Sequence, residues 1–568
     1  MGQVKGEEAL RIGVFICHCG INIGGVVDVP QVVEYARTLP NVVYAEDNLY
    51  TCSSEGLGKI KEGIKKYDLN RVIVASCTPR THEPLFRATC EEAGLNKYLF
   101  EMANIREHCS WAHIHEPKKA TEKAKDIVRM AVAKARLLKP QEEPEIEVTP
   151  SALIIGGGIS GMTASLCLAD QGFKVYIVEK GRELGGRLNQ LYKLYPTLVK
   201  ASEGLNRIVE AVKANRNIEV WTSTVLKQVK GFIGNFDVAV QRGNGETASF
   251  GVGTIIVATG TDVLEPVGMY GYGEYDNVIT QLKLEQLLKD GKLEKPERIV
   301  MIQCVGSREE KGRTYCSRIC CMTALKNAIL VKDMYPDTDV YILFRDLQTY
   351  GGHYEDYRRM AQDRRVKFIK YDLEKPPEVI LRQDGRLTVN VAHALLREQI
   401  NIDTDLVVLS TPLIQREDAR DVSRMLKVPL GSDGFFLEAH VKLRPVDFAT
   451  DGIYVCGTAH SPKDTSESIS QALGVASRAA IPMAVKRLRT EAITALVDEN
   501  LCTGCGTCVK ICPYGAIVKD ERGVARVTEV VCKGCGTCGA SCPEKAITMR
   551  HFTDEQVIAQ ALAAVGRN

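Results

Sequence analysis

Apolar runs separated by amphipathic stretches divide the first 140 residues into alternating strand and helix segments. The strand-like runs lie at 12–16, 42–45 and 71–75, and the residues between them have helix-like spacing of apolar positions. Alternation of this kind is typical of a small parallel α/β domain. We therefore predict such a domain for residues 1–145.

A polar, proline-bearing stretch at 139–144 separates this segment from the next. Directly after it, residues 151–155 read Ser-Ala-Leu-Ile-Ile, which is the pattern of a buried strand and opens a second domain. A helix pattern that begins near Glu467 closes this domain, which we predict to span 146–490. A third domain is predicted for 491–568.

Composition is consistent with several globular domains. A chain of 568 residues is too long for one core, and its 45% hydrophobic and 25% charged residues are ordinary for such proteins. A formal net charge of +2 provides no attractive field for nucleic acid or a membrane surface. No window approaches the roughly 18 apolar residues of a membrane span. The apolar run 12–16 is too short for a signal peptide, since Cys17-His18-Cys19 interrupts it. We expect a reducing, anaerobic cytoplasm.

Most of the 20 cysteines fall into groups, and the clearest is the run C-x2-C-x2-C-x3-C-P, which occurs twice near the C-terminus. This is the spacing of a bacterial-type α+β ferredoxin module with two [4Fe–4S] clusters. Three close thiolates bind one cluster, and the fourth cysteine of each run binds the other. We assign one cluster to Cys502, Cys505, Cys508 and Cys542. We assign the second to Cys532, Cys535, Cys538 and Cys512. Such a module transfers single electrons.

A dinucleotide fingerprint follows the strand at 151–155. Residues 156–161 read G-x-G-x-x-G, a turn that lets backbone amides approach a pyrophosphate at a helix N-terminus. The next strand, 174–178, ends at Glu179, whose carboxylate can accept both hydroxyls of a ribose. NAD is the alternative ligand for this fingerprint, and further segments favour FAD.

The Gly-Gly-Arg sequence at 185–187, together with 254–260 and 452–458, resembles segments of FAD-binding enzymes of the disulfide-reductase type. Thr458 stands where that family usually has an aspartate for the ribityl chain. Downstream, a helix predicted to begin at Ser470 would direct its N-terminal dipole at the isoalloxazine. The candidate FAD-binding residues are Gly156, Gly158, Gly161, Glu179, Lys180, Gly185, Gly186, Arg187, Thr259, Gly260, Gly457, Thr458, Gln471 and Ala472.

Flavoproteins of the thioredoxin-reductase type carry a second Rossmann unit that binds NAD(P)H. We predict the FAD part at 150–262 and 440–490, and a degenerate nicotinamide part at 263–439. The strand at 298–302 runs into Cys304, which stands in place of the first glycine of a second fingerprint. With three later cysteines it can hold a third [4Fe–4S] cluster, since thiolates suit iron–sulfur ligation. The four residues are Cys304, Cys316, Cys320 and Cys321. Structural thiols or a redox disulfide are the alternatives.

Four cysteines of the N-terminal domain follow successive strand-like runs. Because ligands gather at the carboxyl ends of parallel strands, these cysteines are candidates for a fourth cluster. They are Cys17, Cys52, Cys77 and Cys109. Structural or catalytic thiols are the alternative. Cys90, inside a helix pattern, is expected to be a buried small hydrophobe.

Together these segments resemble the iron–sulfur A subunit of CoB–CoM heterodisulfide reductase over essentially the whole chain. The resemblance is carried by 16–20 (Ile-Cys-His-Cys-Gly), 75–84, the cysteine block 315–322, 456–460 (Cys-Gly-Thr-Ala-His) and the terminal ferredoxin. Some members contain an additional ferredoxin inserted in the flavin domain. This chain has no CxxC run between Trp221 and Phe250, so it resembles the short form.

The resemblance implies flavin-based electron bifurcation: a pair of electrons at FAD divides between a high-potential disulfide branch and low-potential ferredoxin. It also implies B and C subunits, a small iron–sulfur subunit linking to hydrogenase or formate dehydrogenase, and a homodimer of this chain. Lys463 is a candidate cation or proton donor near the flavin, with a solvated loop lysine as the alternative. Two other functions remain open, an NAD(P)H:ferredoxin oxidoreductase and a non-bifurcating electron relay or scaffold.

Overall fold

The computed structural model describes residues 9–566 and divides into two compact units. One unit combines Met1–Glu145 with Arg489–Asn568, and the other is Ile146–Leu488. The first eight residues of the predicted N-terminal domain lie outside the described range. The structure thus groups the two ends of the chain, which the sequence prediction treated as separate domains. Short strands β5 (Glu145–Glu147) and β24 (Arg487–Arg489) lie where the chain passes from one unit to the other.

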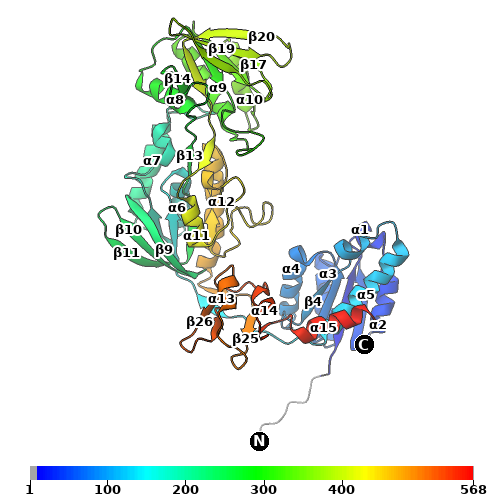
Figure 1. Ribbon diagram of the computed structural model, residues 1–568. Coiled ribbons are helices and arrows are strands. Elements are labelled where there is room, and N and C mark those ends of the chain that lie inside the picture. The colour runs from blue at the N-terminus through cyan, green and yellow to red at the C-terminus, as the bar shows by residue number, and fades with distance from the viewer. Residues whose placement is uncertain (1–8, 567–568) are drawn as a thin grey trace. The chain divides into compact units, whose positions relative to one another are not determined.

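The N-terminal part of the first unit is a parallel sheet of order β2-β1-β3-β4 with helices around it (Figure 1). Helices α2 and α5 contact each other and the sheet, and α3 and α4 form a second pair. The strands are β1 (Ile12–Cys17), β2 (Val42–Asn48), β3 (Arg71–Ser76) and β4 (Phe100–Asn104). The helices are α1 (Ile21–Gly24), α2 (Val29–Arg37), α3 (Ser54–Lys66), α4 (Pro79–Glu92) and α5 (Pro117–Ala135).

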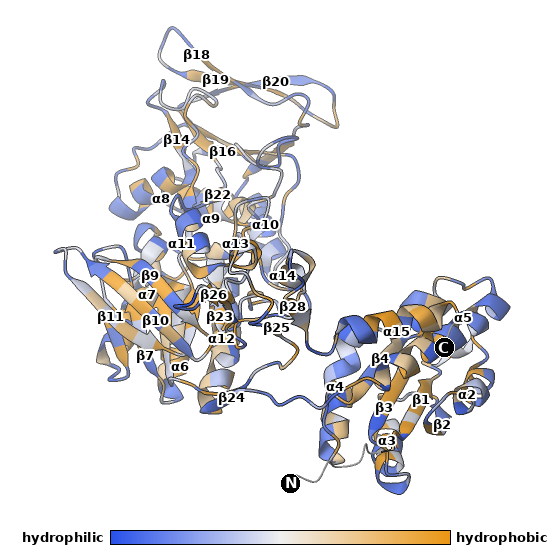
Figure 2. Ribbon diagram, turned by 60° about the horizontal axis from the view of Figure 1, so that its bottom comes forward, coloured by the Kyte–Doolittle hydropathy of each residue, from blue (hydrophilic) through white to orange (hydrophobic). Residues whose placement is uncertain are grey.

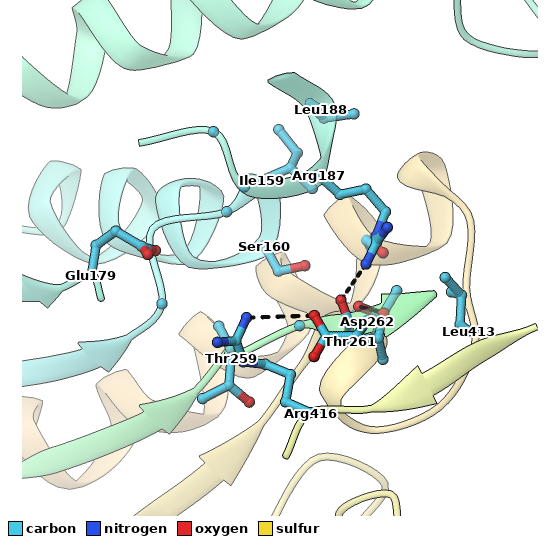
Figure 3. A pocket seen from close by; sticks show the side chains of 18 of the residues that line it. Ile159, Ser160, Glu179, Arg187, Leu188, Thr259, Thr261, Asp262, Leu413 and Arg416 are labelled. Atoms are coloured by element: carbon cyan, nitrogen blue, oxygen red, sulfur yellow. Dashed lines mark hydrogen bonds and ion pairs between the residues drawn. The ribbon is translucent and has the colours of Figure 1, made fainter. Parts of the chain in front are cut away.

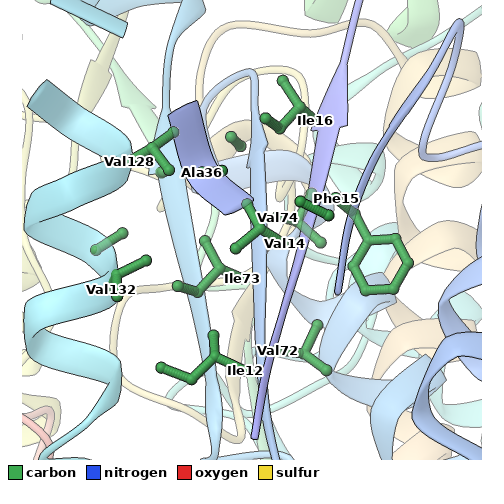
Figure 4. Packing of buried hydrophobic residues seen from close by; sticks show 14 of the residues in the cluster. Ile12, Val14, Phe15, Ile16, Ala36, Val72, Ile73, Val74, Val128 and Val132 are labelled. Carbon is green, nitrogen blue, oxygen red and sulfur yellow. The ribbon is translucent and has the colours of Figure 1, made fainter. Parts of the chain in front are cut away.

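Near-continuous apolar strands explain this arrangement, because a parallel sheet is covered on both faces. Figure 2 shows β1 and β3 as largely hydrophobic, whereas the surrounding helices carry residues of both kinds. Val128 and Val132 of α5 pack beside Ile12, Val14 and other fully buried strand residues (Figure 4). The small parallel α/β domain predicted from the apolar runs is confirmed.

The C-terminal part of this unit contains two small antiparallel pairs, β25 with β28 and β26 with β27. The strands are β25 (Ala495–Val497), β26 (Ile517–Lys519), β27 (Ala525–Val527) and β28 (Ile547–Met549), and the helices are α13 (Thr507–Ile511), α14 (Thr537–Ala540) and α15 (Asp554–Ala564). Helix α15 packs on α5, where Arg129 Nε donates to the Ala563 carbonyl at 2.8 Å. Lys134 of α5 is 2% exposed and pairs with Glu101 at 2.8 Å, and His551 lies 3.5 Å from the same carboxylate.

The second unit contains two similar halves, each with a five-stranded parallel sheet and a three-stranded antiparallel sheet. The first half has the order β23-β12-β6-β7-β8, the doubly wound arrangement of a dinucleotide fold. Its strands are β6 (Ser151–Ile155), β7 (Lys174–Val178), β8 (Ile218–Trp221), β9 (Thr224–Phe232), β10 (Asn235–Arg242), β11 (Thr247–Val252), β12 (Thr254–Val257) and β23 (Ile453–Val455). Its helices are α6 (Ile159–Asp170), α7 (Ala201–Ala214), α11 (Ala419–Leu426) and α12 (Thr465–Ala484).

The second half repeats this plan with the order β14-β21-β15-β16-β17, and the pair β13 and β22 joins the halves. Its strands are β13 (Thr261–Val263), β14 (Val278–Thr280), β15 (Arg298–Ile302), β16 (Asp339–Phe344), β17 (Lys367–Lys370), β18 (Glu378–Leu381), β19 (Leu387–Ala392), β20 (Gln399–Thr404), β21 (Leu406–Leu409) and β22 (Leu413–Gln415). Its helices are α8 (Gln281–Asp290), α9 (Cys320–Met334) and α10 (Tyr354–Asp363). The predicted two-Rossmann core is confirmed.

Candidate flavin and iron–sulfur sites

A cavity of about 560 Å³ opens at the carboxyl ends of β6, β7 and β12 (Figure 3). Most of the residues predicted to bind FAD line it: Gly156, Gly158, Glu179, Lys180, Gly185, Gly186, Arg187, Thr259, Gly260 and Thr458. Lys463 also lines it. The other predicted residues, Gly161, Gly457, Gln471 and Ala472, lie outside the lining.

The three fingerprint glycines are required for different reasons. A Cβ on Gly156, whose φ is +111°, would lie 2.3 Å from the Ala258 carbonyl oxygen. A Cβ on Gly161 would lie 1.9 Å from the Gly156 carbonyl oxygen. At Gly158, by contrast, a Cβ would have no described atom within 4 Å. The fold itself requires the first and third glycines, whereas the second leaves free space for a ligand at the start of α6.

Polar groups in the cavity suit a dinucleotide. Glu179 accepts hydrogen bonds of 2.6 Å from the backbone amides of Gly157 and Gly181, which places its carboxylate beside the glycine turn. Thr259 Oγ1 is buried and has no hydrogen-bond partner among the described residues. Arg187 donates to the Thr261 carbonyl, and burial lowers the pKa of its guanidinium. The unpartnered Thr259 hydroxyl, the Glu179 carboxylate suited to a ribose and the open space at Gly158 together fit FAD.

The cavity lining also contains a buried ion pair that the sequence analysis missed. Glu285 of α8 and Lys326 of α9 are 0% and 2% exposed, form a salt bridge and line the cavity. Lys326 also donates to the Lys193 carbonyl at 3.0 Å. Burial lowers the pKa of Lys326, so its charge depends on Glu285. The signal was a lysine within the mostly apolar stretch Met322–Val331 of α9.

Helix α12 begins earlier than predicted. Asp464 caps its N-terminus in a capping box with Glu467, so the helix starts at Thr465 and the predicted start at Ser470 is wrong. Gln471 therefore lies in the second turn, where its Oε1 accepts from the Gly457 amide at 2.9 Å. Lys463 precedes the cap, and burial lowers its pKa to about 8.

In the ferredoxin-like segment, the structure brings the cysteines together in the predicted crossed pattern. One small cavity is lined by Cys502, Cys505, Cys508 and Cys542. A second is lined by Cys512, Cys532, Cys535 and Cys538. Gly506 and Gly536, both with positive φ, precede the short helices α13 and α14 that present the third cysteine of each run.

The cysteines of the second half also lie close together. Cys304 follows β15 with a φ of +62°, and Cys320 and Cys321 begin α9. Burial, together with the charges of Cys304 and Cys316, raises the pKa of the Cys321 thiol to about 12.

Buried polar atoms accompany this group. Two residues anchor the backbone of the segment Gln303–Arg308, which contains Cys304. The Ser410 carbonyl accepts from the Val305 amide, and Arg345 donates to the carbonyls of Ser307 and Arg308. Within residues 9–566 the polar atoms Gln303 Nε2, Arg308 Nη1, Arg345 Nε and Ser410 Oγ have no partner. Four thiols with unpartnered donors nearby fit an iron–sulfur cluster, whose sulfurs accept hydrogen bonds.

At the N-terminal sheet edge, the structure brings together Cys17, Cys52 and Cys77 but not Cys109. Burial raises the pKa of the Cys52 and Cys77 thiols, and the charges of Cys17 and Cys19 act in the same direction. Cys19 contacts Cys17 through its backbone amide at 3.2 Å.

Cys109 instead donates from Sγ to the Ala120 carbonyl at 3.0 Å, and no cysteine is among the described groups that shift its pKa. Asn48 Nδ2, Thr51 Oγ1 and Ser76 Oγ are buried at the same strand ends, without partners in the described chain. The fourth member of this group by position is therefore Cys19.

Across residues 9–566 no three His, Cys, Asp or Glu side chains are arranged around a single metal ion. Each thiolate of a four-cysteine cluster binds a different iron, so the cysteines stand further apart than ligands of one ion. Over the same residues no helix has the length and apolar character needed to cross a membrane.

Two family models match the chain. Residues 150–306 match the pyridine nucleotide-disulphide oxidoreductase family, and residues 495–549 match the 4Fe-4S dicluster domain. FAD and [4Fe–4S] clusters are therefore cofactors of this chain, and the predicted fold class is confirmed.

Curated relatives cover the whole chain. The A subunit of the H(2):CoB-CoM heterodisulfide,ferredoxin reductase of Methanothermobacter marburgensis is 43% identical, covering 100% of this chain and 99% of the relative. The A subunit of the H(2)/formate:CoB-CoM heterodisulfide,ferredoxin reductase of Methanococcus maripaludis is 38% identical, covering 96% and 97%. The first alignment spans 657 positions against 568 residues here, so at least 89 positions are gaps in this chain, in accord with the short form.

Among solved structures, Lactococcus lactis thioredoxin reductase aligns with 59% of this chain and 99% of its own, at 17% identity and a TM-score of 0.42.

Proposed function

Because the chain belongs to the family of the CoB–CoM heterodisulfide reductase A subunits, we propose that it divides electron pairs at FAD between a high-potential disulfide branch and low-potential ferredoxin. The chain is an oxidoreductase subunit that transfers electrons through FAD and iron–sulfur clusters. The names of its relatives imply a multi-subunit complex.

The position of α9 carries the proposal. This helix begins with Cys320 and Cys321, and its residues Thr323 and Lys326, with Ile319 just before it, line the flavin cavity. A cluster held by these cysteines with Cys304 and Cys316 would thus lie at the wall of that cavity. FAD, when bound, supplies exchange between two-electron and one-electron transfer.

The residues of the chain have distinct parts in this function. The glycine turn and Glu179 would hold the pyrophosphate and ribose, Arg187 would fix the 261–263 strand beside them, and Lys326 would present a desolvated cation that Glu285 holds in place. In the N-terminal domain we propose a cluster on Cys17, Cys19, Cys52 and Cys77, with Cys19 in place of Cys109. The ferredoxin cysteines would hold the two remaining clusters in the crossed pattern.

Iron and acid-labile sulfide per FAD in anaerobically prepared protein test this arrangement. We expect about 16 irons, or about 12 if one of the two further clusters is absent. About 8 irons would mean that only the two ferredoxin clusters are present. That result would favour an NAD(P)H:ferredoxin oxidoreductase instead. Cys304 argues against this function because it replaces a glycine of the second fingerprint.

Reductive titration of the same protein tests the division of electrons. Bifurcation requires that one-electron-reduced flavin stays unpopulated at equilibrium, whereas a passive relay accumulates it.

The proposed partners are B and C subunits, a small iron–sulfur subunit linking to hydrogenase or formate dehydrogenase, ferredoxin and a second copy of this chain. The mass of the complex purified from its source would identify which of them are present.

A further inference from the structure

Four polar side chains between the flavin cavity and the surface form a continuous hydrogen-bonded chain. Lys463 Nζ lies 3.1 Å from His460 Nδ1, and His460 Nε2 lies 2.8 Å from Glu438 Oε2. Gln471 Nε2 lies 2.9 Å from the same His460 Nδ1. Lys463 lines the cavity, while the side chains of His460 and Glu438 are 16% and 14% exposed.

The direction of each hydrogen bond follows from the donors available. The Gly457 amide can only donate, so the oxygen it contacts is Gln471 Oε1 and the Gln471 NH₂ faces His460. Lys463 also has donors only. His460 Nδ1 is therefore the acceptor nitrogen, with its single lone pair shared between the two donors, and the ring proton resides on Nε2, from which it donates to Glu438. The neighbouring groups thus fix one neutral tautomer of His460.

We propose that Lys463, His460 and Glu438 form a proton relay between the flavin cavity and solvent. The inference rests on the proposed function, because a flavin that changes redox state must also exchange a proton. Within the relay Lys463 donates to His460 and His460 donates to Glu438, so both of these hydrogen bonds point from the cavity outward. The relay is set to release a proton when reduced flavin is oxidised.

The step balances in protons and electrons. Lys463 gives a proton to His460 Nδ1 while His460 gives its Nε2 proton to Glu438, and Lys463 takes the proton that leaves the flavin. One N–H bond breaks and one forms at both Lys463 and His460, and Glu438 becomes a carboxylic acid that then releases the proton to water. The iron–sulfur clusters of the proposed function would accept the two electrons. On the next flavin reduction the same path runs inward and restores the first tautomer of His460.

The charges around the relay favour a mobile proton. Burial, followed by the charge of Arg318, lowers the pKa of Lys463 to about 8, although Glu467, Cys456 and Glu438 act in the opposite direction. Burial and the charge of Lys463 lower the pKa of His460, whereas Glu438 and Asp433 raise it by less. Lys463 can therefore lose and regain a proton near neutral pH.

Stopped-flow oxidation of the reduced holoprotein tests the relay. Ferricyanide removes electrons without protons, flavin absorbance follows oxidation, and a pH-indicator dye in weak buffer follows proton release. In the unaltered protein proton release keeps pace with flavin oxidation. In Glu438→Gln and His460→Gln we expect release to lag by about tenfold or more, with FAD content and the flavin spectrum unchanged. His353→Gln, an exposed histidine paired with Asp356, is the control and should behave as the unaltered protein.

His460→Ala with added imidazole provides a second readout, since imidazole restores a relay but not a purely structural side chain. Proton release at the unaltered rate in Glu438→Gln and no response of His460→Ala to imidazole would overturn the relay while leaving the proposed function intact. Absence of FAD from the unaltered protein would instead contradict the proposed function itself.

Discussion

The ferredoxin cysteines and the cysteines beside the flavin cavity differ in how the chain assembles them. Each ferredoxin cavity takes three cysteines from one run of seven residues, and hydrogen bonding with Thr507 and Thr537 lowers the pKa of Cys505 and Cys535. Beside the flavin cavity, Cys304 comes from a strand end and Cys321 from a helix start, and burial raises the pKa of Cys321 to about 12. Local spacing thus leaves one exposed cysteine of each ferredoxin run with a lowered pKa, whereas tertiary folding buries Cys321, which must lose its proton to bind iron.

Thiol alkylation of metal-free protein should show the largest difference between the two regions. A pKa of about 12 leaves Cys321 with about a thousandfold less thiolate at pH 8 than an ordinary thiol, and thiolate is the reactive form. We expect Cys505 and Cys535 to react first with iodoacetamide and Cys321 to react far more slowly than either. Its rate should rise about tenfold per pH unit up to its pKa, because each unit increases the thiolate fraction by that factor. Equal rates, measured by mass spectrometry of peptides, would remove the contrast.

Single cysteine substitutions in the ferredoxin should remove one whole cluster each. Cys508→Ala and Cys542→Ala, although in different runs, line the same cavity and should each cost about four irons per chain. Cys167→Ala, on a partly exposed face of α6, is the control and should retain all iron. If Cys542→Ala instead affected the same EPR signal as Cys532→Ala, the crossed pattern would be wrong.

A comparison of Cys19→Ser with Cys109→Ser sharpens the contrast at the N-terminal sheet edge. We expect loss of about four irons from Cys19→Ser and none from Cys109→Ser, because Cys109 donates to the Ala120 carbonyl away from the other cysteines. The opposite result would restore the ligand set predicted from strand order. Iron per chain, with thermal melting to exclude unfolding, decides between them.

The smallest effect concerns the glycine turn, a local pattern like the ferredoxin runs. Gly158→Ala adds a methyl group to open space, so we expect an unchanged melting temperature with FAD affinity lower by about tenfold. Gly156→Ala places its Cβ 2.3 Å from a carbonyl oxygen and should lower the melting temperature as well. An FAD affinity unaffected by Gly158→Ala, measured by fluorescence titration, would show that FAD does not contact this turn.

Features coded by neighbouring residues were predictable from the sequence, and features created by distant contacts were not. The G-x-G-x-x-G turn, Glu179 and the crossed ferredoxin cysteines follow from spacing within about 40 residues. Cys19 could not be chosen over Cys109 because the decision depends on how the segment after β4 folds. The Glu285–Lys326 pair was missed since its partners lie on separate helices. The start of α12 was misplaced at Ser470 because the capping box of Asp464 with Glu467 was not recognised.

The packing of α15 on α5 has a consequence for how the protein is made. A ribosome adding about 5–20 residues per second needs roughly 20 to 80 s to travel from the end of α5 to α15. Throughout that interval the N-terminal domain has been synthesised, but Ala563, whose carbonyl accepts a hydrogen bond from Arg129 of α5, has not. The face of α5 that α15 covers in the folded protein is therefore exposed to water throughout that interval.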